Sequence, residues 1–167
     1  MFGQRPSFFQ ESIDFELDAE WFTVNGLYFL ANSTDERLRS AIFFPVAART
    51  DSIRLFKVID VTKAERLDVK VVENGFFFHV WMMPRDTIVV NIEYAQPSRR
   101  VNEYVLESTQ TWGQALKKAA YSLKVDDDLR IDSLSLSPDS ICGQTYFWSR
   151  NDFFPSENFC VWVEKFP

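Results

Sequence analysis

The sequence has a single histidine, His79, among its 167 residues, and this scarcity limits the chemistry that it can support. A Ser-His-Asp or Cys-His catalytic site would have to use His79. A zinc site needs several histidine or cysteine ligands, and only Cys142 and Cys160 accompany His79. The five glycines form neither G-x-x-x-x-G-K nor G-x-G-x-x-G, so no phosphate-binding loop is expected. We therefore expect no catalytic residue, no metal and no cofactor.

Positive charge is also scarce, because the net charge is −6 and the isoelectric point is about 4.8. A protein that binds nucleic-acid phosphates normally shows a basic stripe, which the pairs Arg99-Arg100 and Lys117-Lys118 are too short to supply. No run of about 18 apolar residues occurs, so no membrane span is expected. The first residues, MFGQRPSFFQES, lack the apolar core of a signal peptide.

Aromatic residues are abundant instead, at 16% of the chain with 17 phenylalanines, and they favour strands. Alternating or β-rich runs cover residues 13–17, 21–31, 38–46, 53–61, the hairpin within 67–83, 87–94, 101–108, 129–136, 141–148 and 159–166. These are roughly ten strands with frequent turns and no βαβ alternation. The pattern predicts one antiparallel β-sandwich domain over 1–167, immunoglobulin-like or jelly-roll-like, with 1–12 as an irregular lead-in.

The clearest local signal is a hairpin with Asn74-Gly75 at its centre, a pair that favours a two-residue type I′ turn. Such a turn places Val72 opposite Phe77 and His79 opposite Lys70, so His79 is expected to face outward as a strand-surface residue. Trp81 lies on the same mixed outer face, and we expect a second layer or a loop to cover it. One face must then be core, and it comprises Leu67, Val69, Val71, Phe78, Val80 and Met82.

The stretch 111–125 is ambiguous. Thr111 and Gln114 resemble a capping box, and Trp112, Leu116 and Leu123 fit a helical stripe. An alternating strand fits as well, with one face made of Ala115, Ala119, Tyr121, Leu123 and Val125. The local pattern favours neither structure.

Acidic residues offer no specific site. Asp126-Asp127-Asp128, with Asp132 nearby, lacks the oxygen spacing and central glycine of an EF-hand loop, so a solvated turn is favoured over a calcium site. A glycoside hydrolase would need two carboxylates, which distant strands of a sandwich can bring together. Three glutamates are available for this role, and nothing in the sequence singles them out: Glu93, Glu103 and Glu107.

The remaining candidate is an aromatic loop at 149–158 and the strand end before it. Its rings could stack on a sugar or dock a protein partner, or they could fold back and close the end of the sandwich. The candidate ligand-binding residues are Trp148, Asn151, Asp152, Phe153 and Phe154.

Four short pieces of the sequence carry a resemblance. They are Tyr28-Phe29-Leu30-Ala31-Asn32, Phe43-Phe44-Pro45-Val46, Tyr104-Val105-Leu106 with Thr111-Trp112, and Trp148 through Asn151-Asp152-Phe153-Phe154-Pro155. Together they resemble uncharacterised bacterial extracytoplasmic β-sandwich domains, which are often membrane-anchored at one end. The resemblance implies that 112–125 is largely extended and that the location is the cell envelope, although this sequence lacks an export signal and an anchor. It supplies no catalytic residues.

The two cysteines, Cys142 and Cys160, permit either one disulfide or two buried thiols, and the resemblance favours the bridge. We expect a non-enzymatic interaction or structural module of the bacterial cell envelope, part of a larger anchored protein, with a protein or glycan partner. The first alternative is a carbohydrate-binding module with coplanar exposed rings near Trp148 or Trp81. A glycoside hydrolase-type enzyme, with paired carboxylates in a deep cleft, is less favoured.

Overall fold

The computed structural model describes residues 4–164, which fold into strands with two short 3-10 segments. The strands are β1 (Ser7–Leu17), β2 (Trp21–Ala31), β3 (Leu38–Pro45), β4 (Arg54–Asp60), β5 (Glu65–Arg66), β6 (Lys70–Val72), β7 (Gly75–Met82), β8 (Thr87–Pro97), β9 (Val101–Tyr104), β10 (Leu116–Val125), β11 (Ile131–Leu134), β12 (Ser140–Cys142), β13 (Thr145–Phe153) and β14 (Phe159–Val163); the 3-10 segments are η1 (Thr50–Ser52) and η2 (Glu107–Trp112). β1 begins at Ser7, inside the stretch expected to be an irregular lead-in. Residues 1–3 of that stretch lie outside the described chain.

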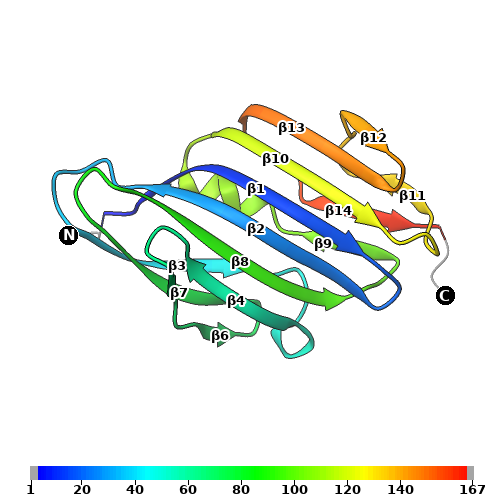
Figure 1. Ribbon diagram of the computed structural model, residues 1–167, viewed down its shortest axis with the longest axis horizontal. Helices are drawn as coiled ribbons and strands as arrows, with labels where there is room; N and C mark the ends of the chain where they lie inside the picture. The colour runs from blue at the N-terminus through cyan, green and yellow to red at the C-terminus, as the bar shows by residue number, and fades with distance from the viewer. Residues whose placement is uncertain (1–3, 165–167) are drawn as a thin grey trace.

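Eight strands form one large twisted sheet in the order β12-β13-β10-β1-β2-β8-β4-β5 (Figure 1). Its neighbours pair antiparallel, except that β1 and β10 run parallel. The mostly β class expected from the sequence is confirmed, but a purely antiparallel sandwich is wrong. No tight turn joins β1 to β10, so nothing local forces them into antiparallel pairing.

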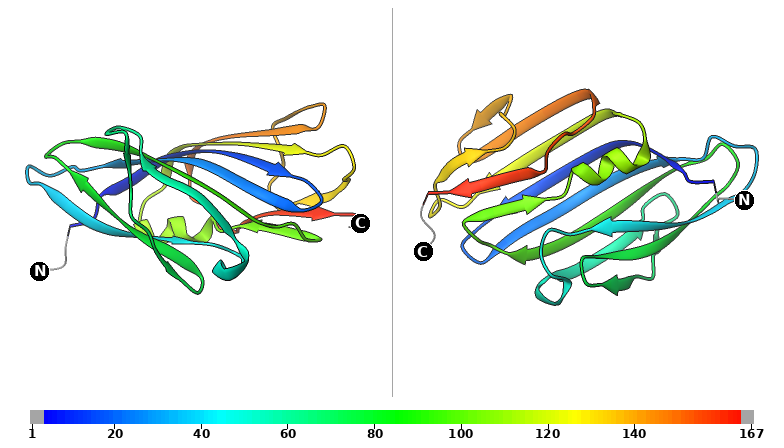
Figure 2. Two further views of the ribbon diagram at one scale, coloured as in Figure 1. Left: turned by 60° about the horizontal axis from the view of Figure 1, so that its bottom comes forward. Right: turned by 180° about the vertical axis from the view of Figure 1, so that it is seen from behind.

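Two three-stranded sheets lie side by side across one face of the large sheet, as the turned views of Figure 2 show. One has the order β3-β7-β6 and the other β11-β14-β9, and η2 lies between them. Their inward side chains and those of the large sheet form one continuous buried cluster. Within residues 4–164, β3 is therefore an edge strand, and its free edge faces the space between the two small sheets.

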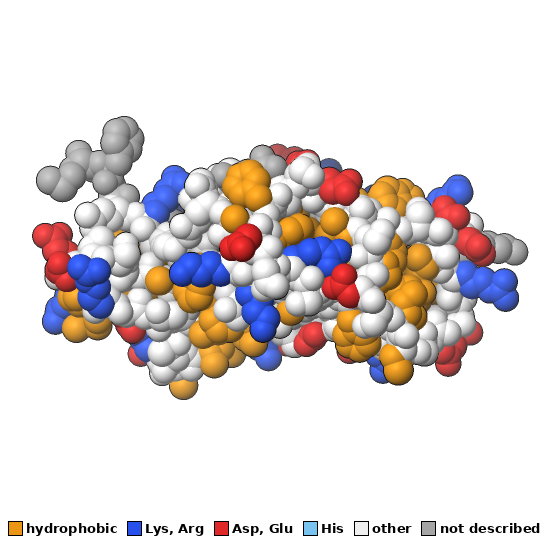
Figure 3. Space-filling model, turned by 90° about the horizontal axis from the view of Figure 1, so that it is seen from above, with side chains coloured by type: hydrophobic (Ala, Val, Ile, Leu, Met, Phe, Trp, Pro, Cys, Tyr) orange, Lys and Arg blue, Asp and Glu red, His pale blue; other side chains and the backbone are white. Residues whose placement is uncertain are grey.

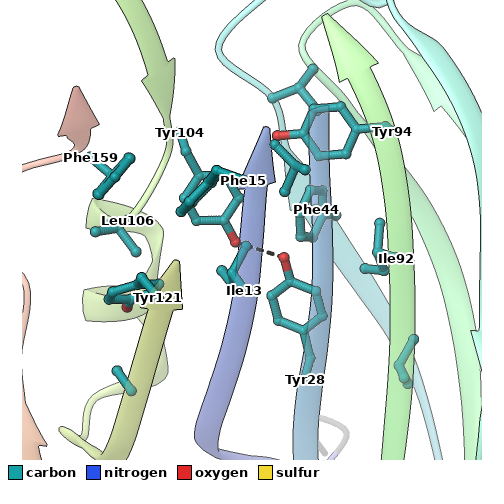
Figure 4. Close-up of a cluster of buried hydrophobic side chains, with 14 of the residues drawn as sticks. Ile13, Phe15, Tyr28, Phe44, Ile92, Tyr94, Tyr104, Leu106, Tyr121 and Phe159 are labelled. Atoms are coloured by element: carbon teal, nitrogen blue, oxygen red, sulfur yellow. Dashed lines mark hydrogen bonds between the residues drawn. The ribbon is translucent and has the colours of Figure 1, made fainter. Parts of the chain in front are cut away.

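Phe15 of β1 lies at the centre of this core (Figure 4). Its ring stacks on Phe22 at 5.4 Å and on Phe159 at 4.5 Å, and Tyr104 meets it edge-on at 5.3 Å between ring centroids. The alternation predicted for 13–17 is confirmed, because the three apolar residues of that run are all buried. Strand alternation alone is enough to direct these side chains inward.

The central hairpin differs from the prediction in its register. Val72 pairs with Gly75, so the turn residues are Glu73 and Asn74, and Lys70 lies opposite Phe77. Gly75 is needed for another reason, because a Cβ there would collide with the carbonyl oxygen of Phe44 on β3. The close approach of β3 overrides the local preference for an Asn-Gly turn.

With the observed register, only part of the predicted core face of the hairpin is buried. Its β7 half is confirmed, since Phe78, Val80 and Met82 are buried. On the other strand, the assignment of Val71 to the core is wrong: β6 is a short edge strand and Val71 is 56% exposed. Leu67 and Val69 precede β6 and are partly buried against the core, so their assignment is confirmed in part.

The ambiguous stretch 111–125 is mostly extended, as the resemblance implied. β10 occupies Leu116–Val125 between β1 and β13, and its inward residues include Tyr121 and Leu123. The helical alternative survives only as the 3-10 segment η2, which ends at Trp112. Pairing with two long strands decides the outcome, because both local patterns were available.

Candidate functional site

A groove of about 640 Å³ runs along the free edge of β3. Successive β3 residues line it, including Ser40, Ala41, Ile42 and Phe43, whose side chains alternate between the two faces of the sheet. Consecutive residues of a strand point to opposite faces of the sheet, so they can all border one groove only if the groove runs along the edge of that strand. The opposite wall comes from Val105, which follows β9, and from four residues of η2: Glu107, Ser108, Thr111 and Trp112.

A smaller cavity of about 50 Å³ lies beneath the groove. The two spaces share lining residues from both walls, among them Phe43, Ser108 and Trp112. The wall of the cavity is mostly apolar and aromatic, and its one acidic residue is Glu11 of β1. An apolar wall with a few polar groups is the usual lining of a ligand pocket, but this cavity is far smaller than the roughly 300–1,000 Å³ that a whole small-molecule ligand occupies.

Glu11 is only 2% exposed, although it is charged in water at neutral pH. It faces inward because it keeps the phase of the buried β1 residues Ile13 and Phe15. The Tyr121 hydroxyl donates a hydrogen bond to its Oε1 atom. Burial, which removes the water that stabilises a carboxylate, raises the pKa of Glu11 to about 7, and the hydrogen bond from Tyr121 only partly opposes this.

Two more tyrosines surround Glu11. Tyr28 is its cross-strand partner on β2, and the hydroxyls of Tyr28 and Tyr104 lie 2.8 Å apart in a hydrogen bond (Figure 4). Burial raises the pKa of both hydroxyls well above the ordinary tyrosine range, and the nearby Glu11 charge raises it further. They therefore stay protonated and offer neutral hydroxyl groups to the cavity.

A second surface feature lies on the outward side of β3 and β7. The Phe43 and Phe77 rings contact each other at 4.9 Å with an angle of 42°, and the Arg39 guanidinium lies 4.9 Å from the centre of the Trp81 ring. Trp81 is 58% exposed, so the expected covering layer or loop is absent from the described chain. We call Arg39, Phe43, Phe77 and Trp81 the outer aromatic face.

His79 lies on this same outward side, as predicted, but its cross-strand partner on β3 is Ala41. With Asp68 and Lys70 it borders an open hollow of about 440 Å³. Hydrophobic side chains reach the surface elsewhere too, including Ile141 of β12 and Phe147 of β13. Figure 3, which looks onto the side where β12 and β13 lie in Figure 1, shows hydrophobic side chains in separate groups with charged residues between them.

The aromatic residues expected to form a loop site are not gathered at one surface. β13 extends to Phe153, so most of the expected site belongs to a strand. Trp148 is 2% exposed, packs edge-on against Phe159 at 5.1 Å, and donates its indole N–H to the Leu136 carbonyl. It cannot present a ring face to a ligand. Phe153 is partly buried against Tyr121.

The other three residues of that predicted site remain at the surface. Asn151 and Asp152 are exposed at the end of β13, and Phe154 is 50% exposed beyond it. Asp152 has a φ of 48°, which bends the chain at this point. Their use in binding stays a prediction.

Both cysteines are free thiols: Cys142 is exposed on β12, and Cys160 is partly buried on β14. The disulfide favoured by the resemblance is therefore absent from the structure, because the two residues belong to different sheets. Within residues 4–164, no group of three His, Cys, Asp or Glu side chains could hold a metal ion, and no helix is long and apolar enough to cross a membrane.

The glutamates considered for glycoside hydrolysis have separate roles. Glu93 on β8 forms an ion pair with Lys57 at 3.0 Å. Glu103 on β9 accepts a hydrogen bond from the Asn158 side chain, whereas Glu107 lies exposed in η2 at the groove. In the aspartate run, Asp126 accepts a hydrogen bond from the Asp128 backbone N–H, as in an ordinary solvated turn.

Glu11 and the tyrosines around it were not among the site residues predicted from the sequence. The available signal was the alternation of β1, in which Glu11 shares the phase of Ile13, Phe15 and Leu17 and is therefore directed inward. A buried carboxyl close to several aromatic hydroxyls becomes evident only once β1, β2, β9 and β10 are placed together.

No known protein family profile matches the chain, and no curated protein matches its sequence. Solved structures do share its fold. A nutrient-binding protein candidate from Legionella pneumophila aligns with a TM-score of 0.70 at 11% identity, over 96% of this chain and 67% of the other. The M1 zinc metallopeptidase from Deinococcus radiodurans aligns with a TM-score of 0.54 at 12% identity, over 96% of this chain. Yeast LTA4 hydrolase aligns at 0.53 and 7% identity, over 95% of this chain.

This chain spans 43% of the metallopeptidase chain and 29% of the yeast hydrolase chain. The fold therefore recurs as one part of longer proteins. At 12% identity or less, these likenesses concern the fold alone.

Proposed function

We propose that this chain is a non-enzymatic binding module, and that its groove receives an extended segment of a partner protein. The observation that carries the proposal is the free edge of β3, which borders a groove of about 640 Å³. An extended peptide can pair its backbone with such an edge, and hollows beside the strand then select its side chains. Eight β3 residues give about 26 Å of edge at 3.3 Å per residue.

The composition of the groove and its surroundings suits a protein partner. Phe43 and Trp112 line the groove, and Trp81 with Arg39 lies on the adjoining outer aromatic face. Aromatic residues and arginine are enriched where proteins bind each other. Arg5 and Glu107 at the groove provide charges of both signs, which could fix the direction of the bound segment.

The occurrence of this fold within longer chains supports an accessory, binding role rather than an independent reaction. An extracytoplasmic location in the bacterial envelope, within a larger anchored protein, is also part of the proposal and rests on the resemblance seen in the sequence. We further propose that the two layers form a β-sandwich of jelly-roll or immunoglobulin type with a mixed main sheet.

Carbohydrate binding is less well supported by the exposed rings. Sugar platforms need accessible rings in a common plane, whereas Phe43 and Phe77 are inclined at 42° and Arg39 covers one face of Trp81. Glycoside hydrolysis is also less well supported, because Glu93, Glu103 and Glu107 are not gathered as a pair in one deep cleft.

The test is selection of a displayed library of random twelve-residue peptides on the purified protein. We expect enriched peptides to slow amide hydrogen exchange along β3 and η2 when they are bound. Ser108→Trp should abolish binding by filling the groove, because Ser108 lines it from η2. Ser133→Trp is the matched control: Ser133 is exposed on β11 outside the groove and should tolerate the change. Failure to enrich any peptide, or protection that maps elsewhere, would refute the proposal.

A further inference from the structure

We infer that the cavity beneath the groove binds a primary ammonium group, with the Glu11 carboxylate as its counter-ion and aromatic rings as its walls. The ammonium group most consistent with the groove is that of a lysine side chain in the bound segment. If the ligand is such a lysine, the inference rests on the proposed function. A free alkyl amine carries the same chemistry, and the experiment below separates the two sources.

Glu11 supplies the negative charge. In the described chain, its carboxyl has one hydrogen-bond partner, the Tyr121 hydroxyl on Oε1. A carboxylate has about four acceptor positions, so most of its capacity is unused. No lysine or arginine of the described chain lines the cavity, and the groups around Glu11 on β2, β9 and β10 are the neutral hydroxyls of Tyr28, Tyr104 and Tyr121. A ligand ammonium would therefore be the first positive charge beside it.

Aromatic rings supply the walls. Phe8 lies 5.7 Å from Trp112 and 6.1 Å from Tyr28, and Tyr28 meets Phe44 edge-on at 5.4 Å between centroids. All four residues line the cavity. Ring faces attract cations, and an aromatic enclosure is a recurring way to bind alkyl-ammonium groups.

The size of the cavity limits what can enter. A water molecule needs at least about 10–15 Å³ on this measure, so 50 Å³ holds only a few non-hydrogen atoms. An ammonium group and its last methylene fit this limit, whereas a whole ligand does not. The rest of a lysine side chain would lie between Phe43, Ser108 and Trp112, which line both the cavity and the groove.

A purely structural role for Glu11 is the competing explanation, in which a protonated carboxyl simply pairs with Tyr121. The two explanations differ in their dependence on pH. Binding of an ammonium group requires the carboxylate, and the pKa of Glu11 is about 7 before binding. About a tenth of the protein holds the carboxylate at pH 6 and about nine tenths at pH 8, so affinity should rise about ten-fold over this range.

The peptide arm of the test uses peptides enriched by the library, with each lysine replaced in turn by norleucine, which has no charge. We expect one lysine to bind about ten- to a hundred-fold more tightly than norleucine at pH 8, since hydrogen bonds to a charged group are strong. Glu11→Gln should abolish this preference, so that the lysine and norleucine peptides bind the variant with similar affinity. Glu16→Gln, an exposed change on the same strand, should leave the preference intact.

The second arm measures n-butylammonium and 1-butanol by NMR titration at pH 6 and pH 8. If peptides fail to bind but Glu11-dependent binding of n-butylammonium persists, the amine site stands and the proposed peptide groove fails. If peptides bind β3 with no preference for lysine, and n-butylammonium binds no better than 1-butanol, the amine site is refuted while the groove stands. A lysine preference that survives Glu11→Gln would also refute it.

Discussion

Replacement of Glu11 by glutamine is expected to stabilise the fold above neutral pH, although it changes a buried group in the core. The pKa of this carboxyl is raised from 4.5 to about 7 by burial. Below pH 4.5 the carboxyl is protonated in both the folded and the unfolded chain, and its ionisation costs nothing. Between pH 4.5 and 7 only the unfolded chain releases the proton, so stability falls as pH rises.

Above pH 7 the full cost of a buried carboxylate is present. At about 1.4 kcal/mol for each pH unit between the two pKa values, that cost is about 3 kcal/mol. Glutamine does not titrate, and it can still accept a hydrogen bond from Tyr121. The free energy of unfolding of Glu11→Gln should therefore exceed that of the parent protein by a margin that grows about 2–3 kcal/mol from pH 5 to pH 8.

Urea denaturation followed by tryptophan fluorescence measures this margin, with Glu16→Gln as the exposed control on the same strand. The control should show no such growth. A margin that is constant from pH 5 to pH 8, or one that narrows, would contradict the assignment of Glu11 as a buried acid with a raised pKa. A binding role for Glu11 also predicts that its replacement stabilises the fold, because residues retained for binding often lower stability.

Two further predictions concern the core and the thiols. Phe15→Ala should lower the free energy of unfolding by about 3–5 kcal/mol, whereas Phe56→Ala, at a 47% exposed position, should cost under about 1 kcal/mol in the same urea assay. Equal effects would show that Phe15 is not the centre of the core. For the thiols, the native protein should be alkylated rapidly at Cys142 and slowly at Cys160, because burial raises the pKa of the Cys160 thiol to about 11. Intact mass after alkylation in denaturant without reductant should show two modified thiols, and an unmodified pair would demonstrate a disulfide.

Those parts of the fold that depend on local patterns could be predicted from the sequence. Ile13, Phe15 and Leu17 alternate, and alternation alone directs them into the core. The outward position of His79 followed from the same rule. Tertiary contacts decided the rest: the approach of β3 to Gly75 moved the hairpin turn by one residue, against the local preference for Asn-Gly.

The candidate site could not be predicted from the sequence, again because tertiary contacts form it. The sequence left open whether Trp148 binds a ligand or folds back into the sandwich; alternation along β13 and contacts with Phe159 and Leu136 place it inside. Glu11 shares the alternation of Ile13 and Phe15, but this phase marks it as inward only if the strand is known to begin before residue 11. The groove exists because two separate sheets lie across a third, and no local sequence pattern predicts that arrangement.

The parallel pairing of β1 with β10 has a consequence for how the chain folds. Partner residues in these strands are 108 positions apart, and β1 lies in the middle of the large sheet. During synthesis β1 is made first, and it can pair with β2 at once, but its other edge stays open until β10 has been made. Closing so long a loop is slow, and an unpaired strand edge invites contact with other chains. A strand that is fully paired in the finished sheet is therefore open to aggregation until β10 has been made.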